Sequence, residues 1–526
     1  MSTDLSAAIL HYGTAGFRMH ADLLDSVMYR VGLLATLRSK ALHGKTIGVM
    51  ITASHNPAQD NGVKLVDPMG EMLKQSWEAY ATRLANANSH EKVAEVYGEI
   101  ARDEKIDLKQ PAKVVFARDT RPSGAALVKA LVDGLTASGA DFVDHGLKTT
   151  PQLHYLTRCI NDASYGKPTE VGYYEKLSQA YKDLVRGLAP LNVTVDCANG
   201  IGAPKLHDFI PYLGDSVRLT TVNGDTEHGI LNHRCGADFV KTQVRKPEGF
   251  DLVPHGIYAS FDGDADRIVF YYADAQGAFH LLDGDRISAL VGAFIIEQVR
   301  AAGIQLEVGV VQTAYANGNS THYLRDELKV PVAFTQTGVK HLHHKAEEYD
   351  IGVYFEANGH GTVVFSKKAH ESIAKAAAAH PDNKALKVLR SLVDVINETV
   401  GDAVSDLLVV LGVLSHRGWT LANWDALYSD LPSRLVKVVV ANRHLFKTIN
   451  ADTQLEQPKE LQEMIDAEVA KYERGRSFVR PSGTEDVVRV YAEAATKEEC
   501  DKLAFTVAGL VFDKAGGVGT KPAEFL

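Results

Sequence analysis

The acidic segment DGDADR carries the clearest chemical signal in the sequence. Three aspartates, Asp262, Asp264 and Asp266, alternate with small residues directly after an apolar run that predicts a strand. Like charges this close repel one another and raise each other's pKa, so the loop needs a counter-charge, and carboxylate oxygens suit Mg²⁺ or Ca²⁺. A solvated acidic turn is the alternative. The pattern predicts a divalent-cation site that takes at least one more ligand from elsewhere, since three carboxylates underfill octahedral coordination.

The segment RPSGTEDVVRVYAE combines arginines, hydroxyls and a glycine. Successive backbone N–H groups around a glycine form a nest for anions, hydroxyls add donors, and arginines add paired charge. Pro-Ser-Gly alone is equally compatible with an ordinary turn, and the flanking arginines favour a phosphate-binding loop. The residues expected to contact the phosphate are Arg480, Pro481, Ser482, Gly483, Thr484 and Arg489.

Two further loops carry polar groups suited to a hydroxyl-rich ligand. EANGHG offers the polar residues Glu356, Asn358 and His360 beside Ala357 and two glycines, and a sugar needs such a mix of donors and acceptors with little steric bulk. A plain turn is the favoured alternative for this motif taken alone. TGVKHLHH adds Lys340 after a glycine turn. Its histidines lack the HExxH arrangement, so we do not predict a zinc site.

The stretch ITASHNP places Ser54 at the end of the apolar run IGVM. Ser and Asn are common turn residues, so a turn without chemistry is one interpretation. A serine–histidine pair is not favoured, because His55 is adjacent and neighbouring side chains of an extended chain point in opposite directions. The chain also offers a cation loop, a phosphate loop and the basic residues Arg18, Lys64 and Arg121. Ser54 is therefore better interpreted as a phosphoryl carrier whose phosphate supplies the missing metal ligand.

The elements that must position these loops alternate along the chain. Short apolar runs such as TIGVMI, KVVFAR, LNVTV, IYASF and IGVYF predict strands, and stretches such as SGAALVKALVDGLTASG have apolar residues at helical spacing. This alternation predicts an α/β protein, in which sites lie beyond the carboxyl ends of strands. The last part, with RLVKVVV, amphipathic helical stretches and the strand-like FVRPS, predicts a separate α+β domain.

A chain of 526 residues is too long for one core, so several domains are expected. The pattern changes near Lys167–Tyr174, near Asp285, after Ser366 and near Val410. The predicted domains are 1–170 with the serine loop, 171–290 with the metal-binding loop, 291–409 with the sugar-binding loop, and 410–526 with the phosphate-binding loop.

Composition narrows the class of protein. The net charge of −10 disfavours a nucleic-acid binder, which usually presents a basic face. The strongest apolar run, Leu407–Leu414, is far shorter than the roughly 20 residues of a membrane span, and the N-terminus has no signal-peptide pattern. The chain has four cysteines and no CxxC spacing, which favours a reducing compartment. We expect a cytoplasmic protein without nucleic-acid or membrane partners.

The same loops resemble, in order, the serine, metal, sugar and phosphate loops of the α-D-phosphohexomutases. The resemblance extends from Tyr12 to the C-terminus through HYGTAGFR, TASHNPAQDNGVKLVDPMGEML, TTPQLHY, DCANGIGA, CGADFVK, VVQTAYANG and TGVKHLHHKAEEYDIGVYFEANGHG. Most members place a strand with a GxDxR segment before the serine loop, whereas ARDTR follows Ser54 here. This order resembles the branch of the family that acts on N-acetylglucosamine phosphates.

The resemblance implies three α/β domains with mixed sheets plus a C-terminal α+β domain around a central cleft, with one loop from each domain. It implies reversible conversion of N-acetylglucosamine 6-phosphate to N-acetylglucosamine 1-phosphate through a phosphoserine enzyme and the 1,6-bisphosphate, on the route to UDP-N-acetylglucosamine. It also implies one Mg²⁺ per chain, glucose or N-acetylglucosamine 1,6-bisphosphate as activator, and a monomer whose partners are small sugar phosphates.

The resemblance also implies roles for single residues. Ser54 would carry the phosphoryl group, Arg18 would steady the transferring oxygens, and Arg267 would orient the metal loop. Lys64 is the first candidate to take the attacking hydroxyl's proton, and His55 and His341 are poorer ones. The implied metal ligands are the Ser54 phosphate, Asp262, Asp264 and Asp266. The implied substrate contacts are Lys340, Glu356, Ala357, Asn358, Arg480, Pro481, Ser482, Gly483, Thr484 and Arg489.

Three other functions are compatible with these loops. A sister mutase would act on glucose or mannose phosphates, an inactive sensor would bind a sugar phosphate without turnover, and a metal-dependent phosphatase would transfer the phosphoryl group to water. Turnover of different sugar phosphates tests for the sister mutase. Turnover and Mg²⁺ dependence test for the sensor, and release of free phosphate tests for the phosphatase.

Overall fold

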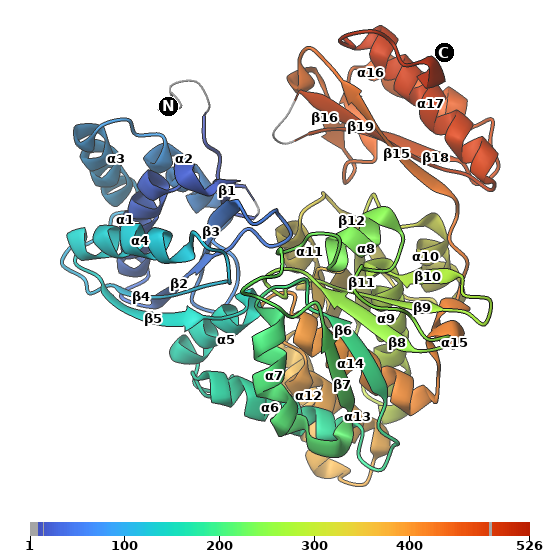
Figure 1. The fold of residues 1–526 in the computed structure, drawn as a ribbon, viewed down its shortest axis with the longest axis horizontal. Helices are drawn as coiled ribbons and strands as arrows, with labels where there is room; N and C mark the ends of the chain where they lie inside the picture. Colours follow the sequence, from blue (N-terminus) through green and yellow to red (C-terminus); the bar gives the residue numbers. More distant parts are fainter. Residues whose placement is uncertain (1–8, 14, 483–485, 526) are drawn as a thin grey trace.

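The computed structural model describes residues 9–13, 15–482 and 486–525, which form four sheet-based domains in succession (Figure 1). We number them I to IV along the chain. Domains I to III are α/β and domain IV is a smaller α+β unit, which confirms the predicted fold class. Among the described residues, no helix has the length and apolar character needed to cross a membrane.

Domain I contains a five-stranded mixed sheet in the order β1-β3-β2-β4-β5. The central strand β2 is buried along its whole length because its apolar side chains meet helices on both faces of the sheet. It pairs in parallel with β4 and antiparallel with β3. The elements are β1 (Phe17–His20), α1 (Asp25–Ala41), β2 (Thr46–Ile51), β3 (Asp60–Val66), α2 (Gln75–Ala85), α3 (His90–Asp103), β4 (Lys113–Arg118), α4 (Gly124–Ala137), β5 (Asp141–Leu147) and α5 (Thr150–Asn161).

Domain II contains a second five-stranded mixed sheet, in the order β10-β9-β8-β6-β7. β6 pairs in parallel with β7 and β8, and β8 pairs antiparallel with β9. The acidic segment forms the tight turn between β8 and β9, as the sequence predicted. The elements are α6 (Glu170–Leu184), β6 (Asn192–Asp196), α7 (Gly202–Leu213), β7 (Arg218–Val222), α8 (Ala237–Gln243), β8 (Ile257–Phe261), β9 (Ile268–Ala273) and β10 (Phe279–Leu282).

Domain III contains a four-stranded mixed sheet in the order β12-β11-β13-β14. The EANGHG loop joins the antiparallel strands β13 and β14. The elements are α9 (Gly284–Ala302), β11 (Val308–Thr313), α10 (Gly318–His322), β12 (Val332–Thr335), α11 (Val339–Ala346), β13 (Ile351–Phe355), β14 (Gly361–Phe365), α12 (Lys367–Ala379), α13 (Lys384–Val395), α14 (Ala403–Arg417) and α15 (Leu421–Asp425).

One apolar core joins domains II and III. The ring of Phe270 on β9 packs edge-on against Trp424 of α15, with 5.5 Å between ring centroids. The expected boundaries at 290/291 and 409/410 fall inside α9 and α14, two helices buried in this core, whereas the boundary at 170/171 falls at the start of α6. Apolar helices that continue through a shared core give no change of composition at a junction between the two domains. We propose to draw the later boundaries at Asp283, the N-cap of α9, and after α15.

Domain IV contains a three-stranded antiparallel sheet in the order β15-β19-β18 and a small β16-β17 hairpin. One face of the sheet packs on α16 and α17 and forms a separate core. The elements are β15 (Ser433–Val439), β16 (Lys447–Ile449), β17 (Gln454–Gln457), α16 (Lys459–Val469), β18 (Arg476–Pro481), β19 (Val487–Glu493) and α17 (Lys497–Lys514). Short 3-10 turns at Ala21–Leu23, Gly214–Ser216, Arg443–Leu445 and Ala523–Phe525 and a π-helical turn at Tyr323–Glu327 complete the chain.

Candidate active site

The serine loop leaves β2 and carries Ser54 in a left-handed backbone conformation, with φ of 51°. Such a conformation is unusual for a residue other than glycine and must be held by its surroundings. The Ser54 side chain is fully buried, and its Oγ donates a hydrogen bond of 2.5 Å to Oδ2 of Asp262 in domain II. The backbone N–H of Ser54 donates to the Thr52 hydroxyl. The hydroxyl is thus aimed at the acidic loop of a different domain.

Arg121 binds the backbone of the serine loop. Its Nη2 donates to the carbonyl oxygens of Ser54 and Asn56, each at 2.9 Å, and its Nη1 donates to the carbonyl of Asp60. Asp119 accepts from Nε at 3.1 Å and fixes the guanidinium. From the sequence, Arg121 was one of several arginines in loops, and nothing indicated that it binds the serine loop. With a further bond from Nη1 to the Pro57 carbonyl, its role is to hold four backbone carbonyls in place with a rigid, fully buried fork.

Gly263 allows the metal loop to approach the serine loop. A Cβ at this position would lie 2.6 Å from the carbonyl oxygen of Ser54, a distance that real Cβ atoms do not reach. Asn232, also in domain II, donates from Nδ2 to the carbonyls of Ser54 and Asn56 at 2.9 and 3.0 Å. Close contact between the two loops therefore depends on a glycine and an amide of domain II.

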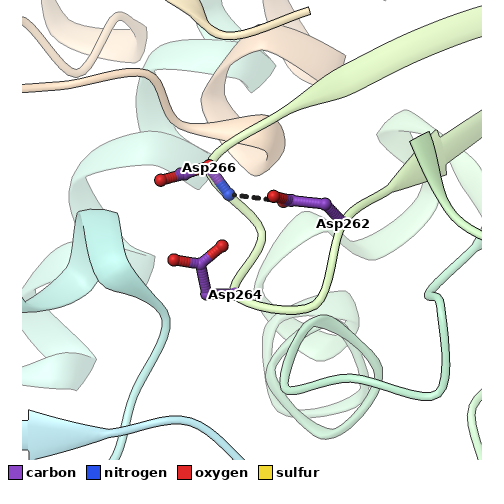
Figure 2. Close-up of side chains that lie close together, drawn as sticks. All are labelled: Asp262, Asp264 and Asp266. Atoms are coloured by element: carbon purple, nitrogen blue, oxygen red, sulfur yellow. Dashed lines mark hydrogen bonds between the residues drawn. The ribbon is translucent and has the colours of Figure 1, made fainter. Parts of the chain in front are cut away.

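Asp262, Asp264 and Asp266 come from one turn, and their side chains lie close together (Figure 2). All three are buried, and one carboxylate oxygen from each lies within 4.8 Å of the others. Oδ1 of Asp262 accepts from the backbone N–H groups of Asp266 and Arg267, each at 3.1 Å. Ala265 has a left-handed φ of 58°, which closes the turn. The backbone of the loop thus holds one carboxylate and brings the other two to its side.

The electrostatics of the triad call for a cation. Burial, and then repulsion from Asp264 and Asp266, raises the pKa of Asp262 well above its ordinary value. Burial acts in the same direction on Asp266, but His360, Lys64 and Arg267 bring its pKa well below the ordinary value. Oδ1 of Asp264 and Oδ1 of Asp266 are buried and accept no hydrogen bond from the described residues. Buried anionic oxygens without donors fit a hard divalent cation.

Lys64 and Arg267 lie against the same carboxylates. Nζ of Lys64 is 3.2 Å from Oδ2 of Asp266 and 3.7 Å from Oδ2 of Asp264. Nε of Arg267 is 3.7 Å from Oδ2 of Asp262 and 3.8 Å from Oδ1 of Asp266. A cation held by the triad would take over charge neutralisation that Lys64 provides in this arrangement.

Arg18 and His55 lie close to Arg267. Burial, and then the nearby Arg267, lowers the pKa of Arg18. Burial, Arg267 and Arg18 lower the pKa of His55 to about 2, so its ring is neutral at physiological pH. Nε of Arg18 and Nδ1 of His55 are buried without a hydrogen-bond partner among the described residues. A ring with so low a pKa is a poor proton acceptor, in keeping with its low rank among the candidate bases.

The EANGHG loop packs directly on the metal loop. Nδ1 of His360 lies 2.7 Å from the backbone carbonyl of Asp266. Gly359 is as tightly constrained as Gly263, because a Cβ there would lie 1.9 Å from the carbonyl oxygen of Ile268. Glu356, Ala357 and Asn358 are half-buried at the same junction, and Nδ2 of Asn358 donates to Glu356. His360, which the sequence offered only as one more polar group for a sugar, links the two loops.

Thr150 is a second contact that the sequence did not reveal. Its Oγ1 donates to Oδ2 of Asp264 at 2.6 Å, and its backbone N–H donates to the Asp264 carbonyl. The TTPQ segment does show a capping box, formed by Thr149 and Gln152 at the start of α5. That signal predicts where the helix begins, and it contains nothing about a partner in another domain.

The predicted phosphate loop joins β18 and β19 in domain IV. Arg480 and Arg489 lie directly opposite each other on these strands, and Lys437 of β15 lies opposite Arg489. The side chains share one face of the sheet with Phe478, which contacts domain III. Three cations in a row repel one another and favour an anion above them. The alternation in RLVKVVV could have placed Lys437 on this face.

The remaining members of this loop divide into two groups. Pro481 ends β18, and the backbone N–H of Ser482 donates to the Val487 carbonyl. Gly483 and Thr484 lie outside the described residues. Their predicted contacts with a phosphate remain predictions.

Lys340, an expected substrate contact, is held between two domains. Its side chain is buried at the contact between domains I and III, where Nζ donates to the Leu73 carbonyl at 2.5 Å and forms an ion pair with Glu78. Lys340 was expected to bind substrate, whereas in this arrangement its amino group is held by domain I. The sequence carried no sign of Glu78 as its partner, because the two residues are far apart along the chain.

Comparison with family models covers most of the chain. Residues 28–91 and 81–166 match phosphoglucomutase/phosphomannomutase, alpha/beta/alpha domain I, and residues 435–510 match the C-terminal domain of the same enzymes. Residues 164–269 and 283–419 match phosphoacetylglucosamine mutase AMG1, domains II and III.

Individual relatives match almost from end to end. The phosphoacetylglucosamine mutases of Sus scrofa and Homo sapiens are 53% and 52% identical over 522 residues, which cover 98% of this chain and 96% of each relative. The crystal structure of Aspergillus fumigatus N-acetylphosphoglucosamine mutase in complex with GlcNAc-6P and magnesium is 53% identical, with a TM-score of 0.93 over 97% of this chain and 96% of that one. The chain therefore belongs to the phosphoacetylglucosamine mutases, enzymes of the α-D-phosphohexomutase superfamily.

Proposed function

We propose that this enzyme interconverts N-acetylglucosamine 6-phosphate and N-acetylglucosamine 1-phosphate by covalent transfer through Ser54. One observation carries the proposal: the buried Ser54 hydroxyl donates to Asp262 of a buried carboxylate triad that has unpartnered oxygens. The relatives' names, and the magnesium and GlcNAc-6P in the Aspergillus fumigatus complex, support the choice of substrate. The product is a precursor of UDP-N-acetylglucosamine.

Transfer takes two steps: the phosphoryl group first passes from Ser54 to the sugar, and a phosphoryl group then passes from the sugar back to Ser54. The sugar's O1 hydroxyl attacks the phosphorus of phosphorylated Ser54, the O1–P bond forms, and the bond from phosphorus to Oγ breaks. The resulting 1,6-bisphosphate turns over, and its 6-phosphoryl group passes back to Oγ, which releases the 1-phosphate. Lys64 is our proposed acceptor of the O1 proton and donor to the leaving oxygen, because its amine lies at the triad.

The protein contributes mainly position and charge. Arg121 and Asn232 hold the backbone of the serine loop, so that Oγ stays aimed at the triad. Arg18 and Arg267 supply buried positive charge next to the reacting oxygens, which is worth most where water is excluded. The hydrogen bonds of Arg121 and Asn232 are in place before substrate arrives, so the serine loop needs little rearrangement during transfer.

Asp262, Asp264 and Asp266, with the phosphate of Ser54, would hold one Mg²⁺ per chain. When bound, that ion would neutralise charge on the phosphoryl oxygens and polarise the phosphorus. We further propose glucose or N-acetylglucosamine 1,6-bisphosphate as activator, because either can load the first phosphoryl group on Ser54.

The substrate would bridge domains III and IV. Glu356, Ala357 and Asn358 would contact sugar hydroxyls, and the loop that starts at Arg480 would bind the phosphate that is not being transferred. The cation row of domain IV supports this assignment. The proposed phosphate contacts are Arg480, Pro481, Ser482, Gly483, Thr484 and Arg489.

We propose that the enzyme works as a monomer in the cytoplasm. One chain supplies the serine, metal, sugar and phosphate loops, so no second copy is needed to complete the site. All four cysteines are unpaired and buried, which fits a reducing compartment.

The test is to follow phosphate on Ser54. The protein is incubated with Mg²⁺ and glucose 1,6-bisphosphate and examined by intact mass and peptide mapping. We expect one phosphoryl group on Ser54 that passes to the sugar when N-acetylglucosamine 6-phosphate is added and is replaced by the 6-phosphoryl group in each turnover, and a decrease in turnover of ~10⁴-fold or more in Ser54→Ala. Ser89→Ala, at an exposed helix N-cap of domain I, is the matched control and should keep full activity. Turnover by Ser54→Ala at a near-normal rate would disprove the covalent mechanism.

The substrate is tested in the same assay. We expect N-acetylglucosamine 6-phosphate to be converted faster than glucose 6-phosphate, and free phosphate to appear far more slowly than isomer. Equal turnover of the two sugars would instead favour a general hexose phosphate mutase, and phosphate release as fast as isomer formation would favour a phosphatase.

A further inference from the structure

Asp452 lies where domain IV meets domain III, next to the proposed phosphate loop. Its Oδ2 is 3.3 Å from Nε of Arg480 and accepts a hydrogen bond of 3.1 Å from the backbone N–H of Thr337 in domain III. Its Oδ1 accepts from the Thr448 hydroxyl at 2.7 Å. The carboxylate is buried, and each of its oxygens has a defined partner. Asp452 thus joins a phosphate-loop arginine to another domain.

The backbone that carries Asp452 is unusual. Residues 450–453 form the turn between β16 and β17, and Asn450, Ala451 and Asp452 all have φ between 51° and 66°. Asn and Asp tolerate this left-handed region, but Ala451 adopts it at a cost in strain. The hydrogen bond from Thr448 and the contact with Arg480 are interactions that hold the turn in this form. A turn of this shape brings the Asp452 carboxylate into contact with Arg480 of the cation row.

The cation row explains why a carboxylate is useful here. Arg480 and Arg489 oppose each other across β18 and β19, so their guanidinium groups repel one another before any phosphate is bound. Asp452 contacts Arg480 through Nε, at one edge of the fork, and a guanidinium has further N–H donors at its far end for a phosphate. A carboxylate at that edge orients the fork without taking up all of its donors.

We propose that Asp452 is a positioning residue for substrate binding. It aims the guanidinium of Arg480 at the phosphate that is not being transferred, and through Thr337 it ties this arginine to domain III, which carries the sugar loop. This inference rests on the proposed function, since it takes Arg480 to be a phosphate ligand. Asp452 acts through Arg480 and does not touch the reacting atoms.

The first experiment compares steady-state kinetics of Asp452→Asn with the wild-type enzyme at saturating Mg²⁺. We expect KM for N-acetylglucosamine 6-phosphate to rise about tenfold and kcat to change less than threefold, because the loss is in binding and orientation. Asp501→Asn is the matched control: Asp501 pairs with Arg434 in the same domain, away from the cation row, and should leave KM unchanged. An unchanged KM in Asp452→Asn would overturn the proposal, and a lower KM would show that Asp452 competes with phosphate.

The second experiment asks whether Asp452 acts through Arg480. In an Arg480→Lys background, Asp452→Asn should raise KM less than threefold, so that the two effects are not additive. Full additivity would contradict positioning and indicate a general loss of structure. If Arg480→Lys itself leaves KM unchanged, the phosphate-loop assignment fails instead, which separates the two hypotheses. Thr448→Val, which removes only a hydroxyl that holds the carboxylate, should raise KM in the same direction by a smaller factor. It keeps the test valid if Asp452→Asn does not fold.

Discussion

The reacting centre and the phosphate-binding face are held in different ways. Ser54, Asp262 and Asp264 are fully buried, and domains I, II and III all contribute hydrogen bonds around them. Arg480 is half-buried and Arg489 is exposed, on a domain with its own core. Domain IV contacts domain III through a small aromatic cluster of Tyr315, Phe478 and Tyr491 and through hydrogen bonds such as those of Arg476 and Asp452.

The difference fits the division of labour in the proposed reaction. Phosphoryl transfer needs atoms placed to within fractions of an ångström, which close packing provides. The phosphate-binding loop must release the sugar bisphosphate so that it can turn over and be bound again, and a separately folded domain permits this. The following substitutions test this contrast, and they are ordered by the size of the expected effect.

Asp262→Asn tests the charge of the reacting centre. We expect kcat to fall by ~10³-fold, since the variant removes charge from a ligand of the proposed Mg²⁺ and weakens the partner of Ser54. Chelation of divalent ions in the wild-type enzyme should have a comparable effect that added Mg²⁺ reverses. Asp225→Asn, on the exposed surface of domain II, serves as control. A variant that keeps more than a tenth of wild-type kcat would argue against the triad as the metal site.

Gly263→Ala tests how closely the two loops must approach. The new methyl group would collide with the Ser54 carbonyl, so the serine loop must shift, and we expect kcat to fall by ~10²-fold. Gly98→Ala, on an open face of α3, should have no effect on activity. Kinetics and thermal unfolding are measured together. If both variants behaved alike, the tight contact would not matter for catalysis.

Arg489→Ala tests the exposed cation row. We expect KM for the sugar phosphate to rise about tenfold, because one charge-assisted contact is lost, while kcat falls less. The effect should shrink at high ionic strength, as expected for exposed charges. Lys471→Ala, elsewhere on the surface of domain IV, is the control. A large loss of kcat with constant KM would place Arg489 in the chemical step rather than in binding.

His154→Asn tests whether burial of the His154 ring makes the stability of the protein depend on pH. Burial, and then the nearby Lys64, lowers the pKa of His154 to about 3, so the ring is neutral in the folded protein. A lowered pKa gives stability that is present above the unfolded value of roughly 6.5 and is lost as pH falls toward 3. Asn keeps a donor for the Gly70 carbonyl that His154 Nδ1 contacts. Between pH 7 and pH 5 the variant should lose about 2 kcal/mol less unfolding free energy than wild type.

The measurement for His154→Asn is calorimetric unfolding across that pH range. His444→Asn, at an exposed site of domain IV, should show the same pH dependence as wild type. If His154→Asn also matched wild type, the histidine would not be held neutral by burial, and the contrast between the two regions would weaken.

The sequence predicted those parts of the fold and site that short segments encode. The turn at Asp262–Asp266, the strand before Ser54 and the α+β end of the chain were all recognisable, because residue types and period 2 or 3.6 are local signals. The same local reading placed the later boundaries inside α9 and α14, two helices that continue through a core shared by two domains, and we propose boundaries at Asp283 and after α15 instead.

Contacts between distant segments could not be predicted. Thr150 on Asp264, His360 on Asp266 and Glu78 on Lys340 depend on how whole domains pack. Arg121 looked like a surface charge because nothing in ARDTRPS shows the four residues whose carbonyls it binds. In each case the partner is fixed by tertiary structure, which leaves no pattern in a single sequence.

The core shared by domains II and III sets the order in which the chain can mature during synthesis. Phe209 and Phe270 leave the ribosome long before Leu411 and Trp424, which cover the same core. At typical translation rates this interval is on the order of tens of seconds, in which apolar side chains of domain II lack their final partners. Domain I has its own core, and only its last helix, α5, also packs on the shared one. Nascent chains that end before α14 should therefore bind chaperones, whereas those that end after domain I should not, until domain II begins to emerge.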